Sequence, residues 1–364
     1  MVAIVLGKLG MNNHKKFWKN KKVLVTGHTG FKGSWLSVLL YVLKAKIYGY
    51  SLKPKKNFIF KKANLKRIFQ KSIYGDILNS KKLYENIKSM SPSIIFHLAA
   101  QPLVVDSYKD PKKTFNTNIF GTINLLEAVK KVKSVKTVII ITTDKVYNIN
   151  KNNPYYNENH PLGASDPYGT SKSCVEFITE SYKKSFFKDR NISIVTARAG
   201  NVIGGGDYSE NRIVPDYLKA LNGKKNLVLR NPEYVRPWQY VLEPLYGYLA
   251  LAKRETLKKT RKLFSAWNFA PNQSDNVSVI KLIQCFQTNK IKKNKINIKI
   301  LKKKQIEKET KILRLNANKS KKILGWKNKY NLKKTTYTIL KWNELTKKNS
   351  QFDMCIKFVK NYLN

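Results

Sequence analysis

The first half of the chain alternates short apolar runs with longer segments in which apolar residues recur every three or four positions. Runs rich in valine and isoleucine predict strands at residues 21–27, 45–52, 72–77, 92–100 and 136–143. Segments with helical spacing predict helices at residues 33–45, 80–90, 117–132 and 168–186. Because apolar strands alternate with helices, we expect a parallel sheet covered on both faces.

The pattern changes after a further predicted strand and loop at 192–204. Helices and loops dominate beyond it, with an extended excursion at 227–241 and lysine clusters around 290–304. We predict an α/β protein with a Rossmann-type, doubly wound parallel sheet and a smaller, mainly helical C-terminal lobe. The expected division is an N-terminal extension at 1–20, a dinucleotide-binding domain with the catalytic residues at 21–200, and a mainly substrate-binding lobe at 201–364. The chain is free to cross between the lobes, and either Met1 or Met11 is the true start.

The composition narrows the class of protein. The 364 residues carry a formal charge of +49, which favours a nucleic-acid partner at first sight. Lysine greatly outnumbers arginine and no nucleic-acid-binding motif is present, so we attribute the charge to solvated surface. Three cysteines without C-x-x-C spacing indicate a reducing compartment, and no apolar run reaches the ~20 residues of a membrane span. We expect a cytoplasmic protein with no nucleic-acid or membrane partner and no metal.

A glycine loop follows the first predicted strand. In "VTGHTGFKGSW", Gly27, Gly30 and Gly33 stand between a strand and the start of a helix. Glycines there allow a tight turn and a close approach to a pyrophosphate, which the helix N-terminus attracts. The second strand ends without the usual acidic residue for the ribose, and Ser51 or Lys53 would take its place. NAD is the expected cofactor, and NADP stays open.

Two further motifs carry candidate chemistry. Tyr168 and Lys172 form Y-x-x-x-K on one face of a predicted helix, where the ammonium would lower the pKa of the phenol and allow it to accept a proton from a sugar hydroxyl. Thr143, Asp144 and Lys145 directly follow a predicted buried strand. This position favours a functional acid and base over a surface ion pair.

A family resemblance joins these motifs. "VTGHTGFKGSWL", "FHLAAQPLV", "TTDKVY", "DPYGTSK", "ARAGNVIGGGDY", "RNPEYVRPWQYVLEPL" and "KKILGW" resemble the CDP-glucose 4,6-dehydratases, which are extended short-chain dehydrogenase/reductases. The resemblance covers roughly residues 21–342. "GHTGFKGSWL", the Asp-Lys pair and "RPWQ" are its specific parts, whereas the glycine loop and Y-x-x-x-K are typical of the whole superfamily.

The resemblance implies a lyase reaction on one sugar. Hydride leaves C4 for the nicotinamide, water is eliminated across C5 and C6, and hydride returns to C6. Tyr168 would take the C4 hydroxyl proton with Lys172 beside it, and Thr143 would position the C4 oxygen. Asp144 would protonate the C6 hydroxyl if burial keeps it protonated, and Lys145 would remove the C5 proton if burial lowers its pKa.

The resemblance also implies the binding residues. The cofactor would contact Gly27, Thr29, Gly30, Phe31, Gly33, Asp76, Ile77, Leu98, Ala99, Ala100, Asn118, Tyr168 and Lys172. The substrate would contact Gln101, Asn201, Arg212, Arg230, Arg236 and Trp238. Arginine suits the diphosphate because it donates two parallel hydrogen bonds. Asp76 could instead be a turn residue, and we interpret His97 as structural.

Alternative functions remain. A sugar-nucleotide 4-epimerase would need Thr143, Tyr168 and Lys172 but would have no use for the Asp144–Lys145 pair. Dehydration of another nucleotide hexose is excluded only by the resemblance, which alone indicates cytosine. A non-enzymatic, basic nucleic-acid-binding protein is disfavoured by the intact Tyr168 and Lys172. By resemblance we expect a dimer or tetramer that makes deoxysugars for cell-surface polysaccharide, such as the O-antigen of lipopolysaccharide.

Overall fold

The computed structural model describes residues 14–149, 155–223, 226–258, 266–289, 296–300 and 310–364. Within them, a seven-stranded parallel sheet has the order β11-β6-β5-β4-β1-β2-β3. Its strands are β1 (Lys22–Thr26), β2 (Lys46–Ser51), β3 (Lys71–Tyr74), β4 (Ile94–His97), β5 (Thr137–Ile141), β6 (Ser193–Ala199) and β11 (Ala266–Phe269). The predicted Rossmann-type sheet is confirmed.

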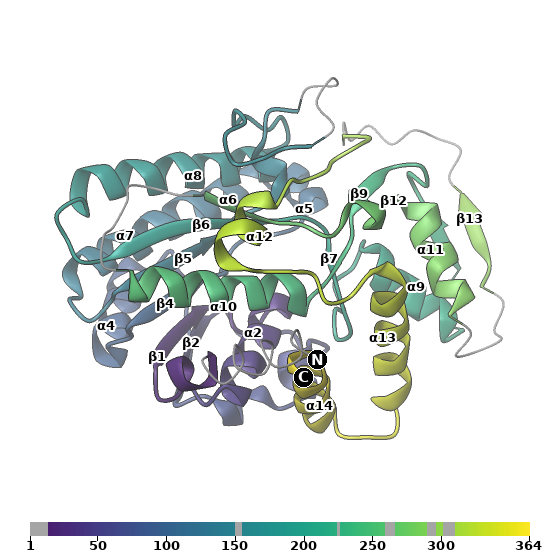
Figure 1. Cartoon of the computed structure of the whole chain (residues 1–364), viewed down its shortest axis with the longest axis horizontal. Coiled ribbons are helices and arrows are strands. Elements are labelled where there is room, and N and C mark those ends of the chain that lie inside the picture. Colours follow the sequence, from purple (N-terminus) through teal and green to yellow (C-terminus); the bar gives the residue numbers. More distant parts are fainter. Residues whose placement is uncertain (1–13, 150–154, 224–225, 259–265, 290–295, 301–309) are drawn as a thin grey trace.

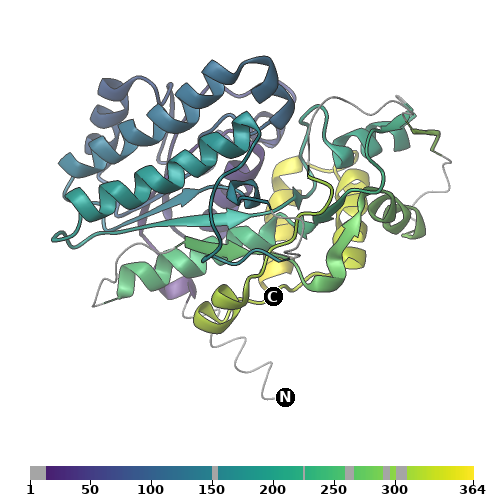
Figure 2. The ribbon, with the colours of Figure 1, turned by 90° about the horizontal axis from the view of Figure 1, so that it is seen from above.

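Helices cover both faces of this sheet (Figures 1 and 2). One face carries α4 (Ser80–Met90), α7 (Gly121–Lys131) and α8 (Pro167–Phe186), and the other carries α2 (Phe31–Val42) and α10 (Leu242–Leu257). Alternate strand residues divide between the faces, because successive side chains of a strand point in opposite directions. Val23 and Val25 join the core on the α2–α10 side, whereas Leu24 between them joins the core on the α4–α7–α8 side.

A smaller lobe lies beyond one end of the sheet (Figure 1). It contains α9 (Ile213–Leu221), α11 (Val279–Thr288) and α13 (Leu332–Leu345), which share a separate core with Trp238. Its short strand pairs are β8 (Leu227–Leu229) with β13 (Ile298–Ile300), β9 (Val235–Pro237) with β12 (Asn276–Ser278), and β7 (Val202–Ile203) with β10 (Gln239–Tyr240). The remaining helical segments include α3 (Ile59–Lys62), α5 (Val104–Lys109), α6 (Pro111–Phe115), α12 (Asn318–Leu324) and α14 (Gln351–Leu363).

The chain crosses between the lobes more than once. After residue 201, α10 returns to pack on β5 and β6, β11 adds the edge strand beside β6, and α14 packs on α2. Helices and loops were predicted to dominate after Gly204, and the edge strand β11 was not predicted. The segment "AWNF" is too short to show a strand pattern, and its pairing with β6 is a long-range contact.

Two of the sequence predictions concern residues that the structure does not describe. The possible starts at Met1 and Met11, and most of the lysine cluster at 290–304, lie outside the described residues. In the described ranges, no helix combines the length and the apolar character needed to cross a membrane.

Candidate active site

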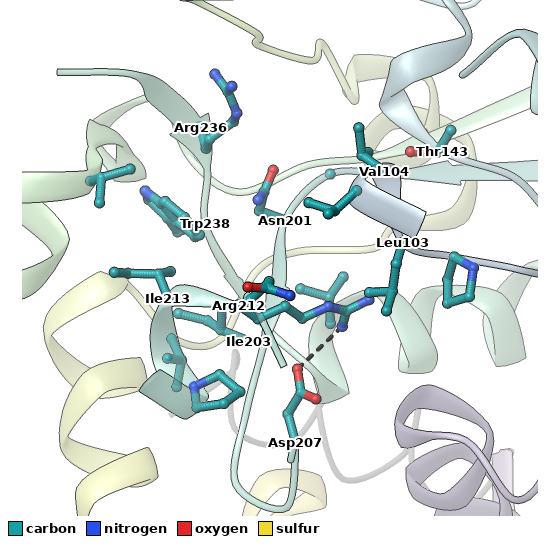
Figure 3. Close-up of a pocket in the computed structure, with 18 of the residues that line it drawn as sticks. Leu103, Val104, Thr143, Asn201, Ile203, Asp207, Arg212, Ile213, Arg236 and Trp238 are labelled. Carbon is teal, nitrogen blue, oxygen red and sulfur yellow. Dashed lines mark hydrogen bonds and ion pairs between the residues drawn. The ribbon is translucent and has the colours of Figure 1, made fainter. Parts of the chain in front are cut away.

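A cavity of about 350 Å³ opens where the carboxyl ends of the central strands face the smaller lobe. Segments that directly follow β5 and β6 supply Thr143 and Asn201, and the smaller lobe supplies Arg212 and Trp238 (Figure 3). Side chains that are far apart in the sequence therefore meet because parallel strands end at the same edge of the sheet.

The glycine loop after β1 has the shape of a dinucleotide site. Gly27 has φ of +71°, and a Cβ there would lie 2.7 Å from the backbone nitrogen of Ala99. Only glycine fits such a left-handed, crowded position. Gly30 is the N-cap of α2, and among the described residues no side chain donates or accepts a hydrogen bond that caps this helix. The first turn of α2 can therefore offer its N–H groups to an anion.

The other predicted cofactor residues follow neighbouring strands. Thr29 bonds at 2.8 Å to the hydroxyl of Ser51, the last residue of β2. Asp76 follows β3 and is exposed, and its carboxylate accepts a hydrogen bond from the backbone of Leu78, as in a turn. The segment with Leu98, Ala99 and Ala100 follows β4. These positions line one edge of the sheet, and their contacts with a cofactor stay a prediction.

The triplet after β5 forms a compact polar group. Asp144 begins a 3₁₀ turn (Asp144–Val146) and is only 3% exposed. The hydroxyl of Thr143 donates to Oδ1 of Asp144 at 3.0 Å, whereas Oδ2 is buried and has no hydrogen-bond partner among the residues that the structure describes. Burial raises the pKa of Asp144, against the charge of Lys145. Asp144 therefore has the burial on which its predicted acid role depends, whereas Lys145 is only partly buried.

Tyr168 and Lys172 lie on the first turns of α8, which Pro167 begins and Asp166 caps. Lys172 Nζ donates to the carbonyl oxygen of Ile141 at 3.1 Å, at the end of β5. The Tyr168 phenol is hydrogen-bonded to Thr143. The acid, the threonine and the tyrosine therefore form one connected group.

The predicted effect on the tyrosine is corrected by the structure. Burial raises the pKa of Tyr168 to about 12 and, with the charge of Lys32, lowers the pKa of Lys172 to about 7. Both groups are removed from water, so desolvation favours their neutral forms and outweighs the attraction that the Y-x-x-x-K spacing predicts.

Asn118 and Gln101 connect the loop after β4 to α8. Asn118 lies in a π-helical turn (Asn116–Phe120), accepts from the backbone N–H of Gln101 at 2.8 Å and donates to Ser171 at 2.8 Å. The amide of Gln101 donates to Leu103 in the same loop and to Thr114 in α6. Gln101 does not line the cavity, whereas Leu103 does. The Gln101 side chain thus shapes this segment, and its contact with the substrate stays a prediction.

The remaining predicted substrate residues do line the cavity: Asn201, Arg212, Arg230, Arg236 and Trp238. Arg212 reaches across it towards Leu103 and bonds to Asp207 at 3.2 Å (Figure 3). Arg236 is 5% exposed and donates to the carbonyl oxygen of Val235 at 2.9 Å.

One histidine and one arginine near the site have structural roles. His97 is 2% exposed and bonds to Thr26 at 2.8 Å, and burial lowers its pKa to about 3. It is therefore neutral, as a structural histidine should be. Arg198 forms a buried ion pair with Glu176 and does not line the cavity.

Sequence reasoning missed Lys32 and Glu176. Lys32 lines the cavity beside Asp144 and Tyr168, and its signal was present in "GFKGSW" within the glycine loop. Glu176 lies one helical turn after Lys172, but nothing in its spacing showed which residue it would pair with.

The sheet, the glycine loop and the Tyr-x-x-x-Lys helix define an extended short-chain dehydrogenase/reductase. Comparison with known proteins narrows the class. The family model for GDP-mannose 4,6 dehydratase matches residues 24–339, and the chain belongs to this family. The chain is 38% identical over 349 residues to CDP-glucose 4,6-dehydratase of Salmonella typhimurium, covering 94% of this chain and 96% of the relative.

More distant relatives include epimerases. The dTDP-D-glucose 4,6-dehydratase of Dictyostelium discoideum is 32% identical over 236 residues, 61% of this chain and 53% of the relative. Two solved structures share the fold at 23% identity. They are dTDP-glucose 4,6-dehydratase from Bacillus anthracis in complex with NAD (TM-score 0.72, 92% of this chain and 99% of that one) and UDP-glucose 4-epimerase from Thermotoga maritima with UDP-glucose (TM-score 0.76, 90% and 99%).

Proposed function

We propose that this chain is an NAD-dependent CDP-glucose 4,6-dehydratase, which converts CDP-glucose to CDP-4-keto-6-deoxyglucose and water. The observation that carries the proposal is the buried carboxyl of Asp144, which lies next to Thr143 and Tyr168. Within the described part of the chain, its Oδ2 has no hydrogen-bond partner. Burial raises the pKa of this carboxyl, and an acid that holds its proton more tightly suits a hydroxyl leaving group. The near full-length relative at 38% identity supports CDP-glucose as the substrate.

The residues of the glycine loop fit NAD. The left-handed Gly27 and the uncapped start of α2 leave room and N–H groups for a pyrophosphate. When bound, the nicotinamide would accept hydrogen from C4 of the sugar and later return it to C6. The Bacillus anthracis relative in complex with NAD supports this choice over NADP.

In the first stage, Tyr168 takes the proton of the C4 hydroxyl while Thr143 holds the C4 oxygen. Burial raises the pKa of Tyr168, so the phenol must lose its proton before it can act as a base. Lys172, one turn later on α8, favours the phenolate when it carries its charge. The product of this stage is a 4-ketone, which acidifies the proton on C5.

In the second stage, Lys145 takes the C5 proton, and the electrons of the C5–H bond form the C5–C6 double bond. The C6–O bond breaks as Asp144 donates its proton, and water leaves. Lys145 then returns its proton to C5 as hydrogen is restored to C6. Tyr168 gains one proton per turnover and Asp144 loses one, and Thr143, which bonds to both side chains, connects them.

A 4-epimerase is the second candidate, because UDP-glucose 4-epimerases are among the relatives, for example that of Mycoplasma genitalium at 27% identity over 222 residues. Epimerisation at C4 needs Tyr168 but no acid at C6 and no base at C5. The buried Asp144 carboxyl, whose Oδ2 has no hydrogen-bond partner among the described residues, therefore favours the dehydratase.

The test is mass spectrometry of CDP-glucose after incubation with purified enzyme and NAD. The expected product has lost one water, and Asp144→Asn should form it far more slowly. UDP-glucose, dTDP-glucose and GDP-mannose in parallel reactions test the base and the hexose, and NADP in place of NAD tests the cofactor. A product of unchanged mass with an inverted C4 centre would establish the epimerase instead.

The biological setting belongs to the same proposal. We propose a cytoplasmic homo-oligomer, a dimer or tetramer, whose product feeds deoxysugar synthesis for a surface polysaccharide such as the O-antigen of lipopolysaccharide. Light scattering after size exclusion would establish the number of subunits. Deletion of the gene should remove deoxysugar from the surface polysaccharide if the assignment is correct.

A further inference from the structure

Lys32 lines the catalytic cavity together with Asp144, Lys145 and Tyr168. It is the second residue of α2, directly after the glycine loop. Among the described residues, no hydrogen bond or ion pair holds its ammonium group. The proposed reaction assigns no role to this lysine, although it lines the same cavity as the acid and the tyrosine.

Its surroundings disfavour a positive charge. The N-terminus of a helix carries a partial positive charge, so a cation there is destabilising. Lys172 and Arg212 both interact with Lys32 through their charges, and Asp144 is the acidic side chain that opposes them. Burial and Arg212 together lower the pKa of Lys32 to about 8. A lysine at this unfavourable position is explained if the site binds an anionic ligand that neutralises its charge.

We propose that Lys32 binds a phosphoryl oxygen of a diphosphate in this cavity, an inference that rests on the function proposed above. Both NAD and a sugar nucleotide carry a diphosphate, and lysine binds phosphate as a mobile point charge. The N–H groups of the same helical turn would share the anion with it. Lys32 is therefore a binding residue for the diphosphate and not an acid or base for the sugar.

The experiment is calorimetric titration of NAD, and separately of CDP, into the wild-type protein, Lys32→Met and Lys32→Arg. Lys81→Met is the matched control, because Lys81 is also the second residue of its helix, α4, but is exposed. Loss of a charge-assisted hydrogen bond should weaken binding roughly 10- to 100-fold. Lys32→Arg should keep most of the affinity, and Lys81→Met all of it.

A second readout separates binding from a structural role. Because Lys32 is partly neutral near pH 8, binding of an anion should raise its pKa and take up protons. Titrations in buffers of different ionisation enthalpy measure this uptake, which Lys32→Met should reduce. The unliganded variant should melt at or above the wild-type temperature, since an unfavourable charge is gone.

The ligand that loses affinity identifies the source of the diphosphate: NAD for the cofactor, CDP for the sugar nucleotide. If Lys32→Met binds both ligands as tightly as wild type does, with the same proton uptake, the inference is wrong. If the wild-type protein binds neither ligand, the proposed function itself fails.

Discussion

Arg198 holds both carboxylate oxygens of Glu176 in a buried ion pair: Nε lies 2.9 Å from Oε1 and Nη2 lies 2.9 Å from Oε2. The same carboxylate accepts hydrogen bonds from Thr142 and Thr196. Glu176 comes from α8, and its partners come from β6 and from the end of β5. The pair thus fixes the helix of Tyr168 and Lys172 against the strands that end at the site.

We expect Arg198→Met to lower the free energy of unfolding by about 3–5 kcal/mol, because it leaves Glu176 buried without a counter-ion. Urea unfolding measures this. The matched control is Lys184→Met, which breaks the exposed pair of Lys184 with Glu180 on the same helix and should cost about 0.5 kcal/mol or less. If both variants lost the same free energy of unfolding, the buried pair would stabilise the fold no more than the exposed pair does.

Variants of Tyr168 and Asp144 should block different steps of the reaction. Tyr168→Phe should abolish C4 oxidation, because no group takes the hydroxyl proton. Asp144→Asn should slow elimination by about 10²- to 10⁴-fold while oxidation proceeds. Stopped-flow absorbance should then show reduced nicotinamide accumulating in Asp144→Asn and not in Tyr168→Phe. Turnover of Asp144→Asn at the wild-type rate would refute the acid assignment.

The sequence predicted the parts of the fold that depend on local pattern. Valine- and isoleucine-rich runs located the strands from β1 to β6, and the glycine loop located the start of α2. The edge strand β11 was missed because "AWNF" has four residues and gains its stability from pairing with β6. Pairing between distant segments has no local signature.

The active site also combines features that the local sequence predicts with features that only long-range packing determines. The sequence placed Asp144 directly after an apolar strand and made its acid role depend on burial, and the structure shows that Asp144 is buried. The pKa of Tyr168 could not be predicted, since it depends on how far burial outweighs neighbouring charges. The partner of Arg198 and the direction of the Gln101 amide are likewise set by packing between segments, which spacing along the chain does not record.

Lys145 should be the base at C5, so its loss should suppress exchange of the C5 proton with solvent. Lys145→Met keeps much of the side-chain length and removes the amine. In deuterated water, NMR should show deuterium at C5 of the product from wild type, and Lys145→Met should show far less while still oxidising C4. Lys133→Met, an exposed lysine just before β5, serves as the control and should label normally. If Lys145→Met incorporated deuterium at C5 normally, Lys145 would not be the base and would only help to position other groups.

Glu243 should make the stability of the protein depend on pH. This buried carboxyl on α10 accepts hydrogen bonds from the backbone N–H groups of Lys329 and Tyr330 and from the hydroxyl of Tyr362 on α14. Burial nevertheless raises its pKa from 4.5 to about 7. The folded protein therefore keeps a proton that the unfolded chain loses, and stability should fall as the pH rises from 4.5 to about 7.

Glu243→Gln tests this dependence because glutamine cannot ionise. At pH 5 the variant should be less stable than wild type, since the amide cannot accept all of these hydrogen bonds. As the pH rises to 7.5 the difference should shrink by about 2–3 kcal/mol, because only wild type must bury a carboxylate. Urea unfolding at each pH measures both proteins, with the exposed Glu85→Gln as the control. If the stabilities of Glu243→Gln and wild type run parallel from pH 5 to 7.5, Glu243 is ionised in the folded protein throughout that range, and the hydrogen bonds that join α10 to α14 outweigh the cost of burying its charge.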